Sequence, residues 1–88
     1  MSTVQLDGKL KQIVIDTLKI PEADYSEDLV AGDHPQWDSI GHVNLLMAVE
    51  HGFEIAFDVT DAIDIESVAD LQDMVRKYTA LKQGPAAG

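Results

Sequence analysis

Ser39 is the side chain of this sequence that is best placed to do chemistry. Its surroundings read Trp37-Asp38-Ser39-Ile40-Gly41-His42. An apolar run from 43 to 50 follows at once, so the hydroxyl lies where a helix is expected to begin. The first backbone N–H groups of a helix lack partners and carry about half a positive charge, so a phosphate ester on Ser39 would be stabilised there.

A second interpretation makes Asp38 or Ser39 an N-cap, which is the commonest reason to find either residue type at a helix start. A capping box would add Glu or Gln three residues later. Here Gly41 follows Asp38 and His42 follows Ser39 at that spacing, so the capping signal is incomplete. The hexapeptide alone favours the cap and leaves the anion site open.

A serine hydrolase would use Ser39 as nucleophile, His42 as base and Asp38 or another acid to orient the base. The sequence has no G-x-S-x-G elbow. Two side chains on one exposed helix would also lack a substrate pocket and an oxyanion hole. We therefore interpret His42 as a surface histidine, and we expect no catalytic residue and no enzymatic activity.

Metal-binding patterns are equally weak. None of the three histidines at 34, 42 and 51 shows a ligand spacing such as H-E-x-x-H. The acids at 58, 61 and 64 step by three, whereas an EF-hand calcium loop needs alternate acids, a glycine and a terminal glutamate. No metal site is expected, and these acids are interpreted as solvated surface.

Length and composition limit the function further. The 88 residues predict one domain over 1–82 with a flexible tail over 83–88. A net charge of −10 argues against nucleic-acid binding, and the absence of cysteine excludes thiolate chemistry. No signal peptide or apolar stretch long enough to cross a membrane is visible, so we expect no membrane association and a cytoplasmic location.

Helices must position Ser39, because the apolar residues recur at helical spacing. A first helix over about 4–18 is predicted by one such face: Leu6, Leu10, Ile13, Val14 and Leu18. A long loop over 19–38 follows, and Leu29 and Val30 are its expected anchors in the core. The second helix is predicted over 39–51.

The ends of the later helices carry their own signals. Gly52 suits the left-handed position that ends a helix, and Phe53 would then fold back onto it. A short third helix or turn is expected among the acids from 58 to 66. Ser67 and Asp70 form a near capping box for a last helix, whose apolar residues are Val68, Leu71, Val75 and Tyr78.

The second helix carries two apolar groups rather than one. Its core group contains Leu45, Leu46 and Val49. A second stripe on a neighbouring face contains Ile40, Val43 and Met47, spaced at i, i+3 and i+7. This stripe is either part of a wider buried arc or an exposed docking surface beside the serine.

The chain resembles the acyl carrier proteins and the related carrier domains of polyketide and peptide synthases, over nearly its whole length. The resemblance is carried by Asp38-Ser39-Ile40, Gly52-Phe53 and Ile65-x-Ser67-Val68, together with small size, acidity and the order of the elements. It implies an all-α fold, a four-helix bundle with a long loop between helices 1 and 2 and a short helix 3.

The resemblance also implies a prosthetic group. Ser39 would be the attachment point of 4′-phosphopantetheine, with Asp38 and Trp37 as the flanking motif. A phosphopantetheinyl transferase, which usually requires magnesium, would transfer the arm from coenzyme A. The thiol of the arm would carry acyl or aminoacyl groups as thioesters.

The partners follow from the same resemblance. They are the transferase, an acyl- or aminoacyl-loading ligase or transferase, and downstream synthase enzymes, bound by a monomeric carrier. The partner-facing positions implied are Ile40, Val43 and Met47, with acidic support from Glu50. The alternative function is an acidic helical interaction adaptor, a degenerate carrier without a prosthetic group in which Ser39 merely caps the helix.

The second helix departs from housekeeping fatty-acid carriers, which commonly have acids at the second and fifth positions after the serine. This chain has Gly41 and Asn44 there, and His42 and His51 replace other polar or acidic residues. The turn from Trp37 to His42 looks more like stand-alone carriers of specialised lipid, polyketide or peptide pathways.

Overall fold

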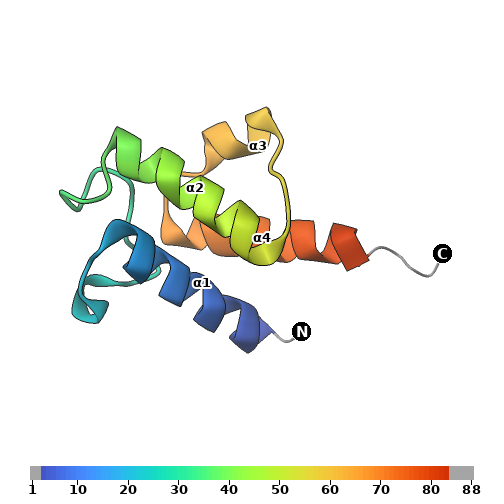
Figure 1. Cartoon of the computed structure of the whole chain (residues 1–88), viewed down its shortest axis with the longest axis horizontal. Coiled ribbons are helices and arrows are strands. Elements are labelled where there is room, and N and C mark those ends of the chain that lie inside the picture. Colours follow the sequence, from blue (N-terminus) through green and yellow to red (C-terminus); the bar gives the residue numbers. More distant parts are fainter. Residues whose placement is uncertain (1–2, 84–88) are drawn as a thin grey trace.

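The computed structural model describes residues 3–83, and these residues form a helical bundle (Figure 1). The helices are α1 (Thr3–Leu18), α2 (Ser39–Phe53), α3 (Val59–Asp64) and α4 (Val68–Gln83). A short 3₁₀ turn, Glu22–Asp24, lies in the loop after α1. The expected all-α fold with a long loop and a short third helix is confirmed.

The core lies where α1 packs against both α2 and α4. The buried face of α1 consists of Leu6, Leu10, Val14 and Leu18. The other two helices add Leu45 and Val49 from α2 and Leu71 and Val75 from α4. Their apolar residues recur three or four positions apart, so each helix buries one face and leaves the other to solvent.

Backbone hydrogen bonds hold the long loop against the start of α4. The Ala31 N–H donates to the carbonyl oxygen of Glu66 across 2.7 Å, and the Val68 N–H donates to that of Leu29 across 2.9 Å. Val30 and Ser67 form an isolated β-bridge between these bonds. Leu29 also packs its side chain against the core, as the sequence predicted. The backbone bonds to the start of α4 are an additional attachment that the apolar pattern could not reveal.

The predicted end of the second helix is wrong. Gly52 is helical, and Glu54 takes the left-handed conformation, with φ 55°. The Ile55 N–H then bonds the Glu50 carbonyl oxygen across 2.9 Å, and the Glu54 N–H bonds that of His51 across 3.3 Å, which is the Schellman pattern. Phe53 remains inside the helix as its last residue.

Packing explains why a glycine occurs at 52. A Cβ atom there would lie 2.7 Å from Cδ1 of Ile13 on α1. The glycine therefore leaves room for the end of the Ile13 side chain, and it does not end the helix. Sequence patterns do not separate these two uses of glycine.

The short third helix and the start of the last one largely follow expectation. Ile63 is exposed on α3, and Ile65 lies beyond that helix and is buried. The Asp70 N–H donates to Ser67 Oγ across 3.1 Å, and the Asp70 carboxylate accepts from the Glu66 N–H across 3.0 Å. The near capping box therefore forms, one residue displaced on its return bond.

The chain ends differ slightly from the prediction. Gln83, which was expected to begin the tail, is the last residue of α4. The rest of the predicted tail, 84–88, lies outside the described residues. Among residues 3–83, no helix is both long and apolar enough to cross a membrane.

Candidate functional site

Asp38 is the N-cap of α2. Its Oδ1 accepts a hydrogen bond from the Gly41 N–H at 2.7 Å, and its carbonyl oxygen accepts from the His42 N–H at 2.8 Å. Ser39 is the first helical residue and is exposed. Within the described residues, its hydroxyl has no hydrogen-bond partner. Asp38 therefore provides the cap, and the hydroxyl of the next residue, Ser39, is not needed for it.

The first turn of α2 also keeps unpaired donors. The backbone N–H groups of Ser39 and Ile40 have no partner within residues 3–83, as expected for a helix start. An anion on the Ser39 oxygen would lie beside these donors and the positive end of the helix dipole. The arrangement therefore fits a phosphate ester at this hydroxyl.

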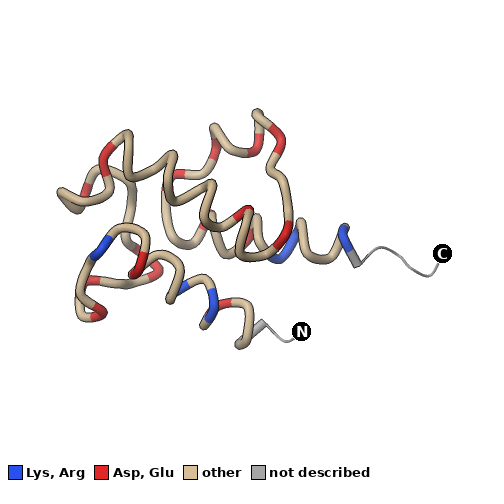
Figure 2. The backbone as a smooth tube through the Cα atoms, viewed as in Figure 1, with Lys and Arg blue, Asp and Glu red and all other residues tan. Residues whose placement is uncertain are grey.

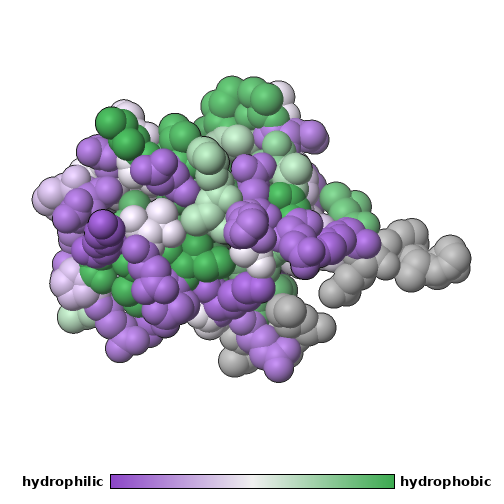
Figure 3. All heavy atoms as spheres, viewed as in Figure 1, coloured by the Kyte–Doolittle hydropathy of each residue, from purple (hydrophilic) through white to green (hydrophobic). Residues whose placement is uncertain are grey.

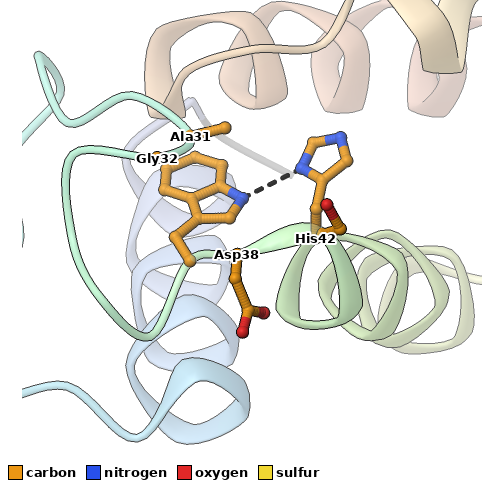
Figure 4. A pocket seen from close by; sticks show the side chains of 6 residues that line it. Ala31, Gly32, Asp38 and His42 are labelled. Carbon is orange, nitrogen blue, oxygen red and sulfur yellow. Dashed lines mark hydrogen bonds between the residues drawn. The ribbon is translucent and has the colours of Figure 1, made fainter.

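Trp37, directly before the cap, is fully buried and pairs with His42. Its indole Nε1–H donates to His42 Nδ1 across 2.9 Å, and the two rings stack with centroids 6.0 Å apart (Figure 4). The interpretation of His42 as a surface histidine is wrong, because the ring is half-buried and held by this bond. Burial lowers the pKa of His42 below its ordinary value.

A hydrolytic triad is not assembled among the described residues. His42 Nδ1 is occupied by the indole N–H, and no described hydrogen bond joins His42 to Ser39. Asp38 directs its bonded oxygen to the helix backbone rather than to the imidazole. The nucleophile, base and orienting acid are close in sequence and are not connected in space.

Two hollows flank the helix start. The first, named here the Ser39 hollow, has a volume of about 490 Å³ and is lined by Ala31, Gly32, Trp37, Asp38, Ser39 and His42 (Figure 4). The second, named the α2–α3 groove, has a volume of about 440 Å³ and is lined by His42, Leu46, Glu50, Phe57, Val59, Ala62 and Ile63. His42 belongs to both.

The second stripe of α2 is exposed. The side chains of Ile40, Val43 and Met47 are 73%, 56% and 60% exposed, and these three residues are called the α2 stripe below. Figure 3 shows hydrophobic atoms at the surface along α2 and α3. Of the predicted core group, Leu45 and Val49 are fully buried. Leu46 is only half-buried, because it faces the α2–α3 groove.

Glu50, which was expected only to border the partner-facing surface, also makes a structural hydrogen bond. Its Oε2 accepts a hydrogen bond from the Phe57 N–H at 2.8 Å, so this carboxylate holds the connection between α2 and α3. Neither the Glu50 contact nor the Trp37–His42 pair was found from the sequence. A buried indole N–H needs an acceptor, and that requirement is the one sequence signal that pointed to a nearby polar side chain.

Charges are unevenly distributed around the site (Figure 2). All six Lys and Arg residues lie on α1, at its end or on α4, and none lies on α2 or α3. The α2 stripe is therefore bordered by acids and neutral residues. Among the described residues, no three His, Asp or Glu side chains come together as a metal site would require.

Known proteins with the same organisation are acyl carrier proteins. No family model matches the chain. An acyl carrier protein of Thermosynechococcus vestitus is 31% identical over 86 residues, covering 91% of this chain and 99% of the relative. An acyl carrier protein of Desulforapulum autotrophicum is 32% identical over 81 residues, covering 84% and 97%.

A solved structure agrees with these relatives. The solution structure of a holo acyl carrier protein from Geobacter metallireducens matches with a TM-score of 0.77 and 29% identity, over 89% of this chain and 88% of that one. Fold and site thus define a small helical carrier rather than an enzyme. The chain belongs to the acyl carrier protein family, whose members carry acyl groups on serine-linked 4′-phosphopantetheine.

Proposed function

We propose that Ser39 is the attachment point of 4′-phosphopantetheine and that this chain shuttles thioester-bound acyl groups between biosynthetic enzymes. The observation that carries the proposal is the exposed, unpartnered Ser39 hydroxyl at the first position of α2. Asp38 satisfies the cap, so esterification of Ser39 breaks no hydrogen bond of the fold. When bound, the arm supplies the thiol that this cysteine-free chain lacks.

Attachment needs little from the carrier itself. The Ser39 oxygen would bond to phosphorus of the coenzyme A pyrophosphate, whose phosphoanhydride bond breaks to release adenosine 3′,5′-bisphosphate. The hydroxyl proton must pass to a base of the phosphopantetheinyl transferase, because no described residue hydrogen bonds the hydroxyl. The N–H groups of Ser39 and Ile40 would then stabilise the resulting phosphodiester.

We assign the α2 stripe as the surface to which the partner enzymes bind, including the transferase and the loading enzyme. It lies on the same helix as Ser39, and its three exposed apolar side chains are neighbours on one helix face, as expected of the contiguous apolar patch of an interaction site. Glu50 would border the stripe, although one of its oxygens is already committed to Phe57. Trp37 would not contact the enzymes, since its side chain is fully buried; it would support the surface by holding His42.

The pathway that we favour is a specialised lipid, polyketide or peptide pathway, with acyl or aminoacyl cargo. Support comes from Gly41 and Asn44, which leave the start of α2 without the acids typical of housekeeping carriers. At 41 the loop itself requires the glycine, since a Cβ there would collide with the backbone oxygen of Gln36. We further propose that the protein acts as a monomer in the cytoplasm.

Intact-mass analysis after co-expression with a phosphopantetheinyl transferase tests the proposal. The mass should rise by one phosphopantetheine in the wild type and in Ser26→Ala, which removes another exposed hydroxyl. Ser39→Ala should remain unmodified. An unmodified wild type across several transferases, with partner binding retained in Ser39→Ala, would instead establish an adaptor without a prosthetic group.

A further inference from the structure

His42 lies where the two hollows of the site meet. It lines the Ser39 hollow together with Trp37, and it lines the α2–α3 groove together with Leu46. His42 follows Ser39 by three residues on α2, so the two side chains share one face of the helix. A group attached to Ser39 that extends toward the groove would therefore pass this imidazole.

The contact with Trp37 determines which nitrogen of His42 carries the proton. An indole N–H can only donate, so Nδ1 must accept, and the neutral ring then carries its hydrogen on Nε2. Nε2 has no partner among the described residues and is not sealed from solvent. Figure 4 shows that the ring nitrogen of His42 without a dashed line points away from the bonded one.

The remaining walls of the α2–α3 groove offer no comparable side-chain donor. Leu46, Phe57, Val59 and Ile63 are apolar, and the one other ionisable side chain, Glu50, accepts a bond from the Phe57 N–H. A single polar group in an apolar pocket fixes the orientation of a ligand, because a hydrogen bond gains strength where water is excluded. His42 is that group here.

Resting on the proposed function, we propose that His42 is a binding residue for the arm on Ser39, with its Nε2–H donating a hydrogen bond to a carbonyl oxygen. The carbonyl belongs either to an amide of the pantetheine or to the thioester of the cargo. A neutral donor suits a neutral carbonyl, and burial lowers the pKa of His42, which favours the uncharged ring. The contact would hold the arm at the mouth of the groove.

Nitrogen-15 NMR of the histidine side chains tests this proposal on three forms of the full chain. These are the unmodified protein, the protein with a free phosphopantetheine arm, and the butyryl-loaded protein. Intact mass establishes each form first, so a failure of attachment is distinguished from a failure of the contact. The Nε2 and Nε2–H signals of His42 should shift, while those of His34 and His51 should not.

The three forms separate the possible acceptors. A shift that is complete in the free-arm form assigns the acceptor to a pantetheine amide, and a shift that needs the butyryl group assigns it to the thioester. Unchanged His42 signals in both modified forms would overturn the proposal. A rise in the His42 pKa on attachment would also overturn it, because that rise would indicate contact with the phosphate instead.

A matched variant gives an independent readout. His42→Asn keeps an acceptor near the Nδ1 position for the Trp37 N–H and removes the Nε2 donor. On attachment of the butyryl arm, the amide NMR signals of the α2–α3 groove should shift less in His42→Asn than in wild type, because the arm loses one hydrogen bond to the groove. His51→Asn on the same helix should give the wild-type shifts. Equal shifts in wild type and His42→Asn would contradict the proposal, and the wild-type histidine NMR decides it if the variant does not fold.

Discussion

Gly41 lies directly against the backbone carbonyl oxygen of Gln36, so closely that a Cβ atom at 41 would collide with it. The end of the long loop therefore lies close against the first turn of α2, at a distance that only a residue without a side chain permits. A backbone oxygen cannot move aside as a flexible side chain can, so the contact predicts a strong response to substitution.

Gly41→Ala should reduce the free energy of unfolding by about 1–3 kcal/mol, because overpacking outweighs the gain in helix propensity. Urea denaturation provides the measurement. The control is Gly8→Ala in α1, where no atom lies within 4 Å of the added Cβ. That variant should gain about 0.5–1 kcal/mol from propensity alone. Equal effects at the two positions would refute the packing explanation.

Asp38→Ala should destabilise the protein by about 1 kcal/mol, because it removes the acceptor of the Gly41 N–H. Asp38→Asn keeps an acceptor of similar capping strength and should remain close to wild type. Thermal unfolding of both variants measures the difference. If Asp38→Asn lost as much stability as Asp38→Ala, the carboxylate charge rather than the cap would be responsible.

Met47→Ala should slow transfer of phosphopantetheine to Ser39 while leaving stability within about 0.5 kcal/mol of wild type, as expected for an exposed residue. An anchoring residue of an interface contributes more than about 1 kcal/mol, so kcat/KM of the transferase should fall about fivefold or more if Met47 is such an anchor of the α2 stripe. Leu81→Ala on α4 is the control, since Leu81 is 64% exposed and lies away from the α2 stripe. A similar loss with Leu81→Ala would contradict the assigned surface.

Tyr78→Phe should loosen α3. The Tyr78 hydroxyl donates to the Asp61 carboxylate and accepts from the Asp58 N–H at 3.0 Å, so it ties the N-cap and the first turn of the short helix to α4. Hydrogen exchange over 58–64 should become faster, with little change in α1. The hydrogen bond from Tyr78 holds the pKa of Asp61 below its ordinary value, so that pKa should rise in the variant. Unchanged exchange would show that the Lys77–Asp61 ion pair and the apolar contacts hold α3 without the Tyr78 hydroxyl.

The stability of the protein should fall as the pH drops below about 6.5, in part through His42. The folded-state pKa of His42 is lower than its unfolded value, so the unfolded chain binds the extra proton first. The contribution of His42 is therefore complete above the unfolded pKa and is lost as the pH falls toward the folded one. The difference in unfolding free energy between wild type and His42→Asn, measured from pH 8 to 5, should shrink over this interval. A constant difference would show that His42 titrates normally.

Local patterns were sufficient for most of the helices. The recurrence of Leu6, Leu10 and Val14 predicted α1, and the Ser67–Asp70 spacing predicted the start of α4. The position of Ser39 at a helix start was also visible, because capping chemistry acts within one turn. These features depend on residues three or four apart, which is the range that sequence periodicity reports.

The sequence by itself determined an all-α fold, a hydroxyl at the start of an apolar helix and an acidic chain without thiols. Only the tertiary structure decided that the α2 stripe is exposed, that Gly52 lies against the Ile13 side chain, and that His42 accepts a hydrogen bond from Trp37. Each of these depends on which segment covers which face of a helix. That choice follows from the packing of residues far apart in the chain, and no local pattern contains it.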